Sequence, residues 1–137
     1  MSKIKLGILA GGNSIEREVS LKSCDNVLNN LDKEKYDIHI FTIPNDQKNK
    51  WIDDLINTKP DVVVSTLHGG LGENGSMQGL LHCLNIPYVG SKVLASALCM
   101  DKKSTKTVLE ANHVVIYKHL DIYILKGVKV FLSMLMK

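Results

Sequence analysis

The acidic residue Glu16 follows a glycine-bearing turn in the stretch LAGGNSIEREVSL. Glycines let the backbone approach a ligand closely, and the free N–H groups at a helix start favour negative charge. Two interpretations are open: Glu16 closes a capping box with Asn13 as the N-cap, or its carboxylate receives the positive charge of a ligand. Position alone favours capping. The turn is neither a dinucleotide fingerprint, because the third glycine is missing, nor a Walker A loop, because no Gly-Lys-Ser/Thr follows.

A second stretch, TLHGGLGENGSMQG, holds four glycines within seven residues. This density exceeds what a tight turn requires, so it favours a ligand-contacting loop over a flexible connection with a solvated histidine. His68 is the first residue beyond the preceding apolar run, and Glu73 and Asn74 lie at the tip of the loop. His68 and His82 have no third partner, so we predict no metal site here.

Two lysines, Lys102 and Lys103, lie in the stretch SALCMDKKSTK at the predicted start of a helix. The helix dipole disfavours cations at that position, and a buried or bound anion would compensate for it. Plain solvent exposure is the simpler interpretation, and without other information it is favoured.

The apolar residues switch repeatedly between strand-like and helix-like spacing. This pattern predicts strands at residues 3–10, 36–43, 61–67 and 86–90 and helices at residues 15–31, 49–58, 76–85, 91–100 and 101–112. The apolar stripe of the first helix is expected to comprise Ile15, Val19, Ser23, Val27 and Leu31, widened by Cys24 and Leu28. Such alternation is typical of an α/β fold, an open parallel sheet with helices on both faces. Both glycine-bearing loops follow strands and are therefore expected at the same edge of the sheet, where ligands bind.

The composition is that of a globular domain: 137 residues suffice for one core, with 45% apolar and 23% charged residues. No apolar run approaches the roughly 20 residues of a membrane span, and the amino terminus lacks a signal-peptide cleavage site. The three cysteines, odd in number and without a CxxC pair, are expected to be reduced and buried, as in a cytoplasmic protein. Residues 101–137 are basic, but no nucleic-acid motif accompanies their lysines, so nucleic-acid binding is not expected.

Four stretches, GGNSIEREVSL, LHGGLGENGSMQGLL, IPYVGS and ASALCMDK, resemble in order and spacing the amino-terminal part of D-alanine–D-alanine ligase, an ATP-grasp enzyme family. The resemblance covers residues 3–112. It implies a pre-ATP-grasp, Rossmann-like substrate-binding domain at residues 1–112 and a divergent tail at 113–137. In this family ATP phosphorylates the carboxylate of one D-alanine, and the amine of a second attacks the acylphosphate, giving a precursor of peptidoglycan. Mg²⁺ or Mn²⁺ ions neutralise charge on the transferred phosphoryl group.

The resemblance implies roles for four residues of this sequence. Glu16 matches the glutamate that orients the ammonium group of the first D-alanine, so it is the expected catalytic and substrate-binding residue. Val19 matches an apolar neighbour in the same pocket, and His68 matches the histidine near the substrate carboxylate. Lys102 matches a lysine that reaches the phosphates of ATP. The resemblance therefore favours ligand binding by Glu16, with capping as a second role.

The family continues beyond this chain through a central and a carboxy-terminal domain, which supply the phosphate loop, the adenine pocket and the metal ligands. After VLEAN the family usually runs through Gly, Ile or Leu, and Pro, whereas this chain reads HVVIYKHLDIYILKG. We therefore interpret the chain as an amino-terminal fragment, one explanation being a premature stop after a change of reading frame. Nucleotide sequence past the stop codon that encodes no missing ligase domain in any frame would contradict the frameshift.

We expect the chain to bind D-alanine, to bind neither ATP nor a metal ion stably, and to be inactive alone. The alternative functions are a non-catalytic small-molecule-binding, regulatory or dimerisation module, and one half of a split ligase. A homodimer is one option for its assembly. Neither a nucleic-acid nor a membrane partner is expected, and the expected location is the cytoplasm.

Overall fold

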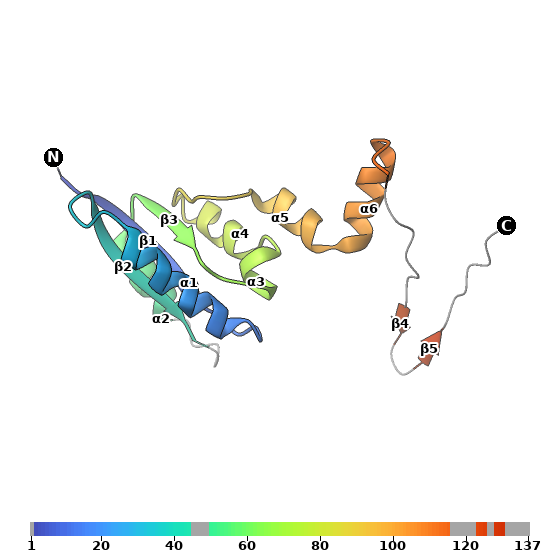
Figure 1. Ribbon diagram of the computed structural model, residues 1–137, viewed down its shortest axis with the longest axis horizontal. Coiled ribbons are helices and arrows are strands. Elements are labelled where there is room, and N and C mark those ends of the chain that lie inside the picture. Colours follow the sequence, from blue (N-terminus) through green and yellow to red (C-terminus); the bar gives the residue numbers. More distant parts are fainter. Residues whose placement is uncertain (1, 45–49, 116–122, 126–127, 131–137) are drawn as a thin grey trace. The chain divides into compact units, whose positions relative to one another are not determined.

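The structure, a computed structural model, describes residues 2–44, 50–115, 123–125 and 128–130 (Figure 1). The chain divides into two compact units, residues 1–105 and residues 106–137. The domain boundary expected after residue 112 stays a prediction.

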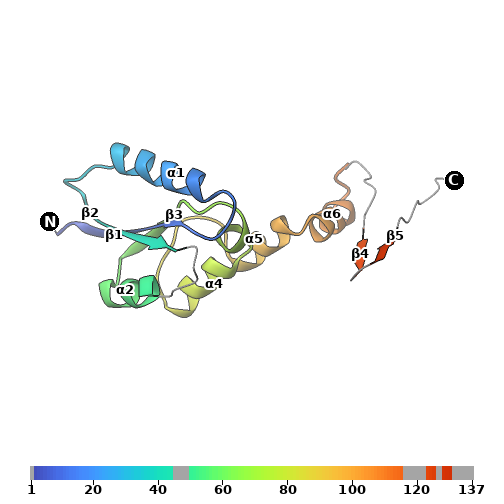
Figure 2. The same cartoon turned by 90° about the horizontal axis from the view of Figure 1, so that it is seen from below.

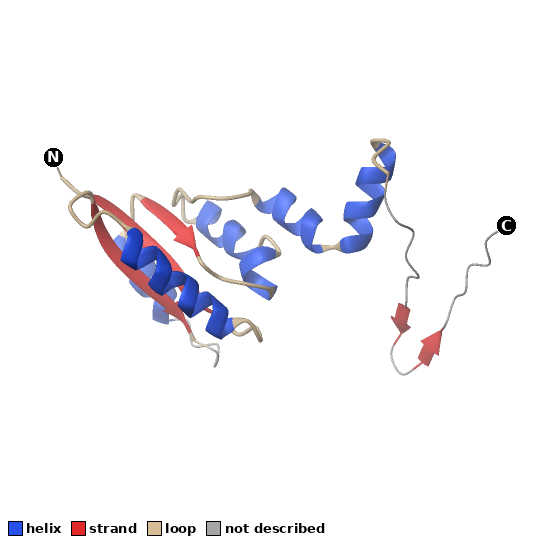
Figure 3. Cartoon of the chain, viewed as in Figure 1, coloured by secondary structure: helices blue, strands red, loops and turns tan. Residues whose placement is uncertain are grey.

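Three parallel strands form the sheet of the first unit, in the order β2-β1-β3 (Figure 3). Their bounds are β1 (Ile4–Gly11), β2 (Tyr36–Ile43) and β3 (Val62–Ser65). In the central strand, Leu6 pairs with Ile38 on one side and with Val62 on the other. Three of the four predicted strands are confirmed, and the central position of β1 places its carboxyl end between the ends of its two neighbours.

The fourth predicted strand, at residues 86–90, is reduced to a single parallel bridge between Tyr88 and Val63. The backbone N–H of Val63 donates to the carbonyl of Pro87 at 2.8 Å, and the N–H of Val89 donates to the carbonyl of Val63 at 2.9 Å. Because Pro87 has no N–H, it cannot extend this pairing into a longer ladder.

Helices cover both faces of the sheet (Figure 2). α1 (Arg17–Asn30) lies on one face, and α2 (Lys50–Thr58) and α4 (Ser76–Cys83) lie on the other. Side chains alternate along β1, so Leu6, Ile8 and Ala10 are buried with Cys24 on the α1 side. The opposite core comprises Leu9, Phe41, Leu55, Val63, Leu67, Met77, Leu81 and Ile86. The predicted α/β fold, an open parallel sheet with helices on both faces, is confirmed.

The inner face of α1 differs from the predicted apolar stripe. Ile15 precedes the helix and is fully exposed, and Val19 is 49% exposed. Ser20 is buried instead, and its hydroxyl accepts a hydrogen bond from the N–H of Gly11 at 2.9 Å. A buried polar group needs a hydrogen-bond partner, and this bond supplies one. It therefore allows Ser20 to be buried, although the apolar pattern does not place residue 20 on the inner face of α1. The carboxy-terminal part of the stripe, Cys24, Val27, Leu28 and Leu31, packs against the buried side chains of β1 as predicted.

Three further helices are α3 (Gly70–Glu73), α5 (Val93–Met100) and α6 (Lys102–Ala111). The last two confirm the helices predicted from residue 91 to residue 112. The single turn α3 was not predicted, because its two glycines are poor helix formers.

The tail, for which the sequence predicts no single structure, contains an antiparallel pair, β4 (Tyr123–Leu125) and β5 (Val128–Val130). Among the described residues, no helix is both long and apolar enough to cross a membrane.

The three cysteines are free thiols, but only Cys24 is buried. Cys83 in α4 and Cys99 in α5 are exposed, so the expectation of three buried thiols is wrong for these two. Burial, and next the charge of Asp25, raise the pKa of the Cys24 thiol. Its reactive thiolate form is therefore suppressed.

Candidate functional site

The first loop is fixed by the helix that follows it. Gly11 and Gly12 have positive φ angles of 87° and 95°, which turn the chain away from β1. The guanidinium of Arg17 then donates through Nη1 to the carbonyls of Gly12 at 2.8 Å and Ile43 at 2.6 Å. It thereby ties the ends of β1 and β2 to the first turn of α1, directly beside Glu16.

The second loop leaves β3 at the same edge of the sheet. The buried hydroxyl of Thr66 donates to the carbonyl of Leu9 at 3.0 Å, which fixes the loop's start against β1. Gly69 then adopts a φ of 66° and precedes the single turn α3.

The two loops meet at a direct hydrogen bond. The hydroxyl of Ser14 donates to the carbonyl of His68 at 2.7 Å and accepts from the backbone N–H of Glu16 at 3.1 Å. The carboxylate of Glu16 lies against Gly69, where a Cβ atom would overlap its Oε2. The backbone angle favours glycine at residue 69, and a side chain there would displace the flexible Glu16 carboxylate. The prediction that the two glycine-bearing loops share one edge of the sheet is confirmed.

The imidazole of His68 is positioned from two sides. Its Nε2 shares a hydrogen bond with the hydroxyl of Ser23 at 3.2 Å, and its Nδ1 lies 3.9 Å from Oε1 of Glu73. The side chain is 37% exposed, so one face stays open to a ligand. Ser23 was assigned to the apolar stripe of α1, and its polar role was missed. A serine within an otherwise apolar periodic stripe is the signal that could have indicated it.

Glu16 does not close a capping box. It occupies the N-cap position itself, with φ −92° and ψ 12°, and its side chain makes no capping hydrogen bond. Asn13 lies outside the helix, because α1 starts at Arg17. The backbone N–H of Glu16 donates instead to the hydroxyl of Ser14. Within the described part of the chain, the Glu16 carboxylate has no hydrogen-bond or ion-pair partner. The capping interpretation is therefore wrong, and this exposed carboxylate is available to a ligand.

Three side chains follow one face of α1, because Glu16, Val19 and Ser23 recur at helical spacing. His68 reaches this face through Ser23. An anionic carboxylate, an apolar side chain that is half exposed and an imidazole therefore border a common surface. That combination suits a small ligand with a positive group and an apolar branch. No group of three His, Cys, Asp or Glu side chains within the described residues could hold a metal ion.

Lys102 is the first residue of α6 and its side chain is exposed. The carboxylate that precedes it caps the helix: Oδ1 of Asp101 accepts the backbone N–H of Ser104 at 2.6 Å. This bond offsets part of the dipole penalty for a cation at the helix start. The side chain of Lys102 thus projects from a fixed helix end, and its role in phosphate binding stays a prediction.

The Asp101 cap predicts a pH dependence at the start of α6. Hydrogen bonds from the backbone and side chain of Ser104 lower the pKa of the Asp101 carboxyl below its ordinary value. A lowered folded-state pKa gives a stabilisation that is present above the free-aspartate value of about 3.9 and lost as the pH falls through the folded-state value. We expect the Ser104 amide resonance to titrate with a midpoint below about 3.9, and this step to vanish in Asp101→Asn, which keeps a capping oxygen. A midpoint at or above the ordinary value would contradict the cap.

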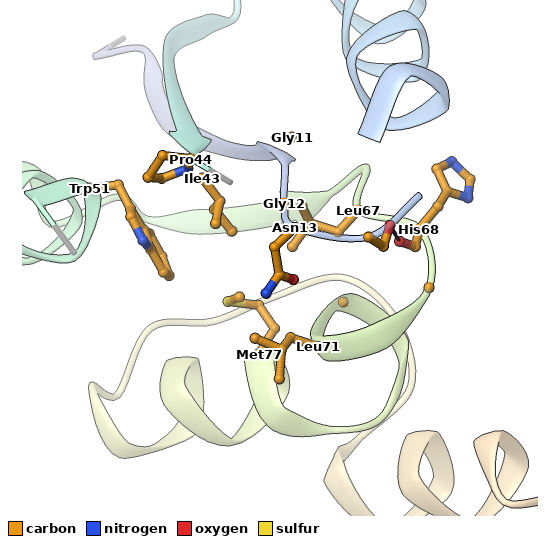
Figure 4. A pocket seen from close by; sticks show the side chains of 13 residues that line it. Gly11, Gly12, Asn13, Ile43, Pro44, Trp51, Leu67, His68, Leu71 and Met77 are labelled. Atoms are coloured by element: carbon orange, nitrogen blue, oxygen red, sulfur yellow. Dashed lines mark hydrogen bonds between the residues drawn. The ribbon is translucent and has the colours of Figure 1, made fainter. Parts of the chain in front are cut away.

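A cavity of about 280 Å³ lies beneath the two loops (Figure 4). Its lining residues are Gly11, Gly12, Asn13, Ser14, Ile43, Pro44, Trp51, Leu67, His68, Gly69, Leu71, Gly72 and Met77. Neither Glu16 nor Val19 lines it, and the imidazole of His68 points away from it (Figure 4). The cavity is therefore distinct from the surface bordered by Glu16 and His68, although both adjoin the contact between Ser14 and His68.

Comparison with known proteins gives consistent results. The family described as D-ala D-ala ligase N-terminus matches residues 5–59 and 52–91. The D-alanine–D-alanine ligase of Clostridium beijerinckii is 44% identical over 111 residues, which cover 80% of this chain and 35% of the relative. Ligase A of Escherichia coli K12 is 35% identical over 150 residues, covering 80% of this chain and 41% of the relative.

Solved structures show the same similarity. A crystal structure of D-alanine–D-alanine ligase from Bacillus anthracis complexed with ATP matches with a TM-score of 0.72 and 37% identity, covering 82% of this chain and 36% of that chain. The VanG D-Ala:D-Ser ligase from Enterococcus faecalis matches with a TM-score of 0.73 and 29% identity, covering 85% and 44%. The chain thus spans less than half of the length of each of these relatives.

Proposed function

Because the chain belongs to the D-alanine–D-alanine ligase family, in which it matches the amino-terminal part, we propose that residues 1–112 bind the first D-alanine of an ATP-dependent ligation. In this reaction a carboxylate oxygen of the first D-alanine attacks the γ-phosphorus of ATP, and ADP leaves. The amine of a second D-alanine then attacks the acyl carbon, phosphate leaves, and a peptide bond forms. The part of this chain is to hold the first substrate in place.

The contact between Ser14 and the carbonyl of His68 is the observation that carries this proposal. It joins the loop of Glu16 to the loop of His68, so that a carboxylate and an imidazole border one surface. In the proposed complex the carboxylate of Glu16 accepts hydrogen bonds from the ammonium group of D-alanine. Val19 contacts the methyl group, and His68 donates toward the substrate carboxylate.

The nucleotide would be held largely by groups outside this chain. Lys102 is the one residue that we propose to reach the phosphates of ATP. No set of three metal ligands occurs in the described residues, so we assign no step to a metal ion held by this chain. In the complete reaction, bound Mg²⁺ would neutralise charge on the transferred phosphoryl group. We therefore propose that the chain binds D-alanine without forming ADP or dipeptide.

Titration of the chain with D-alanine, followed by NMR, tests the proposal. We expect saturable shifts of the resonances of Ser14, Glu16 and His68 with D-alanine and much weaker shifts with L-alanine, because inversion at Cα moves the methyl group away from Val19. A parallel assay with D-alanine and Mg-ATP should release no ADP. Equal binding of both enantiomers, or no binding of either, would overturn the proposed substrate site. Release of dipeptide would overturn the proposed inactivity.

A further inference from the structure

The cavity beneath the loops is lined by no charged side chain. Of its 13 lining residues none is Lys, Arg, Asp or Glu, and the only titratable side chain among them, that of His68, points away (Figure 4). A phosphate or an amino-acid zwitterion would lose its hydration there without an ionic partner. The cavity is therefore suited to neither substrate of a ligase and favours an uncharged molecule.

The cavity walls combine apolar surface with the exposed polar side chain of Asn13. Leu67 and Met77 are buried, Trp51 is half-buried, and Leu71 is 50% exposed at the rim. The carboxamide of Asn13 points between these apolar side chains (Figure 4). Among the described residues this carboxamide has no hydrogen-bond partner, although it offers an N–H donor and a carbonyl acceptor side by side.

From this lining we propose that the cavity is a second binding site, for a small uncharged heteroaromatic molecule with an adjacent hydrogen-bond donor and acceptor. The ring would pack against Trp51 and Met77, and the donor–acceptor pair would face Asn13. A volume of about 280 Å³ lies at the small end of ligand pockets, which typically measure about 300–1,000 Å³. It fits a single bicyclic ring system and leaves no room for a nucleotide.

This site shares one residue with the proposed D-alanine site, His68, whose imidazole points away from the cavity (Figure 4). Glu16 and Val19 do not line the cavity, and an uncharged aromatic ring offers Glu16 no cation to bind. A chain that does not bind D-alanine would therefore not contradict the second site. A cavity that binds no uncharged ring would likewise not contradict the D-alanine site.

Indazole is a suitable probe, because it is uncharged and bicyclic and carries a ring N–H next to a ring nitrogen acceptor. Trp51 is the chain's one tryptophan, so its indole N–H gives a single NMR resonance inside the cavity wall. We expect this resonance to shift saturably as indazole is added. The absence of a saturable shift would overturn the proposal.

Leu71→Glu tests the location of the site. Leu71 is half exposed, so the variant should fold, but a carboxylate at the rim would face an uncharged aromatic ring. We expect indazole affinity to fall about tenfold. Leu94→Glu is the matched control, because Leu94 is 77% exposed on α5 and does not line the cavity. Equal affinities of the two variants would contradict binding in this cavity.

Asn13→Ala tests the polar contact. Benzofuran has the shape of indazole but lacks both its N–H donor and the adjacent nitrogen acceptor, so the wild-type chain should prefer indazole by about three- to tenfold. In Asn13→Ala that preference should disappear, while benzofuran binds as before. A preference that persists in the variant would show that Asn13 does not recognise the ligand, and would overturn the proposed class of ligand.

Discussion

Glu16→Gln is expected to weaken D-alanine binding about tenfold or more and to leave the fold intact. The substitution removes the negative charge that faces the substrate ammonium, and a charge-assisted hydrogen bond contributes about 1.5–3 kcal/mol. The side chain makes no capping bond, and its carboxylate has no partner among the described residues, so the folded chain loses no internal contact. D-alanine titration by NMR and thermal unfolding of the same samples would measure the two effects separately.

Glu18→Gln is the control for charge alone. Glu18 lies in the first turn of the same helix and is exposed, so both variants lose a similar interaction with the helix dipole of roughly 0.3–1 kcal/mol. We expect the two variants to unfold at nearly the same temperature and only Glu16→Gln to lose affinity. Equal losses of affinity would point to a general effect of charge. A lower unfolding temperature of Glu16→Gln alone, with unchanged affinity, would restore the capping interpretation.

The strands could be predicted from sequence because their patterns are strong and local. Residues 36–43 alternate cleanly, and the residues of β1 are apolar on both faces because the strand lies at the centre of the sheet. The pairing of residues 86–90 was harder to predict. Pro87 blocks a ladder without preventing a single bridge, and whether one forms depends on the distant residue Val63.

The two loops of the candidate site could be predicted from sequence, but the hydrogen bonds that join them could not. The density of glycines identified both loops, but the start of α1 depends on a hydroxyl that bonds two backbone groups at once. Ser14 takes the N–H of Glu16 locally and the carbonyl of His68 across 54 residues. No local pattern encodes the second bond. The cavity beneath the loops is harder still to predict from sequence, because the loops, the end of β2 and the helices α2, α3 and α4 supply its walls.

Gly11→Ala is expected to destabilise the first unit by about 2–5 kcal/mol, since two penalties combine. Alanine at a φ of 87° costs roughly 1–2 kcal/mol, and overpacking adds typically about 1–3 kcal/mol. The added Cβ would lie 2.7 Å from the carbonyl oxygen of Ile43 and 2.7 Å from Nη1 of Arg17. These two groups form the hydrogen bond that ties β2 to α1. Moving either group away from the new Cβ would therefore break this hydrogen bond. For a domain of this size the unfolding temperature should fall by about 10 °C or more.

The control for Gly11→Ala is Gly79→Ala, in which the same methyl group is added within a helix. Gly79 has no positive φ, and no heavy atom lies within 4 Å of the new Cβ. Because alanine is the better helix former, this variant should be more stable than the wild-type chain by about 0.5–1 kcal/mol. Urea unfolding of the two variants should therefore move in opposite directions. If Gly11→Ala and the wild-type chain unfolded at the same urea concentration, the contact between Arg17 and Ile43 could not be holding the loop of Glu16 in place. The proposed substrate site would then need another source of rigidity.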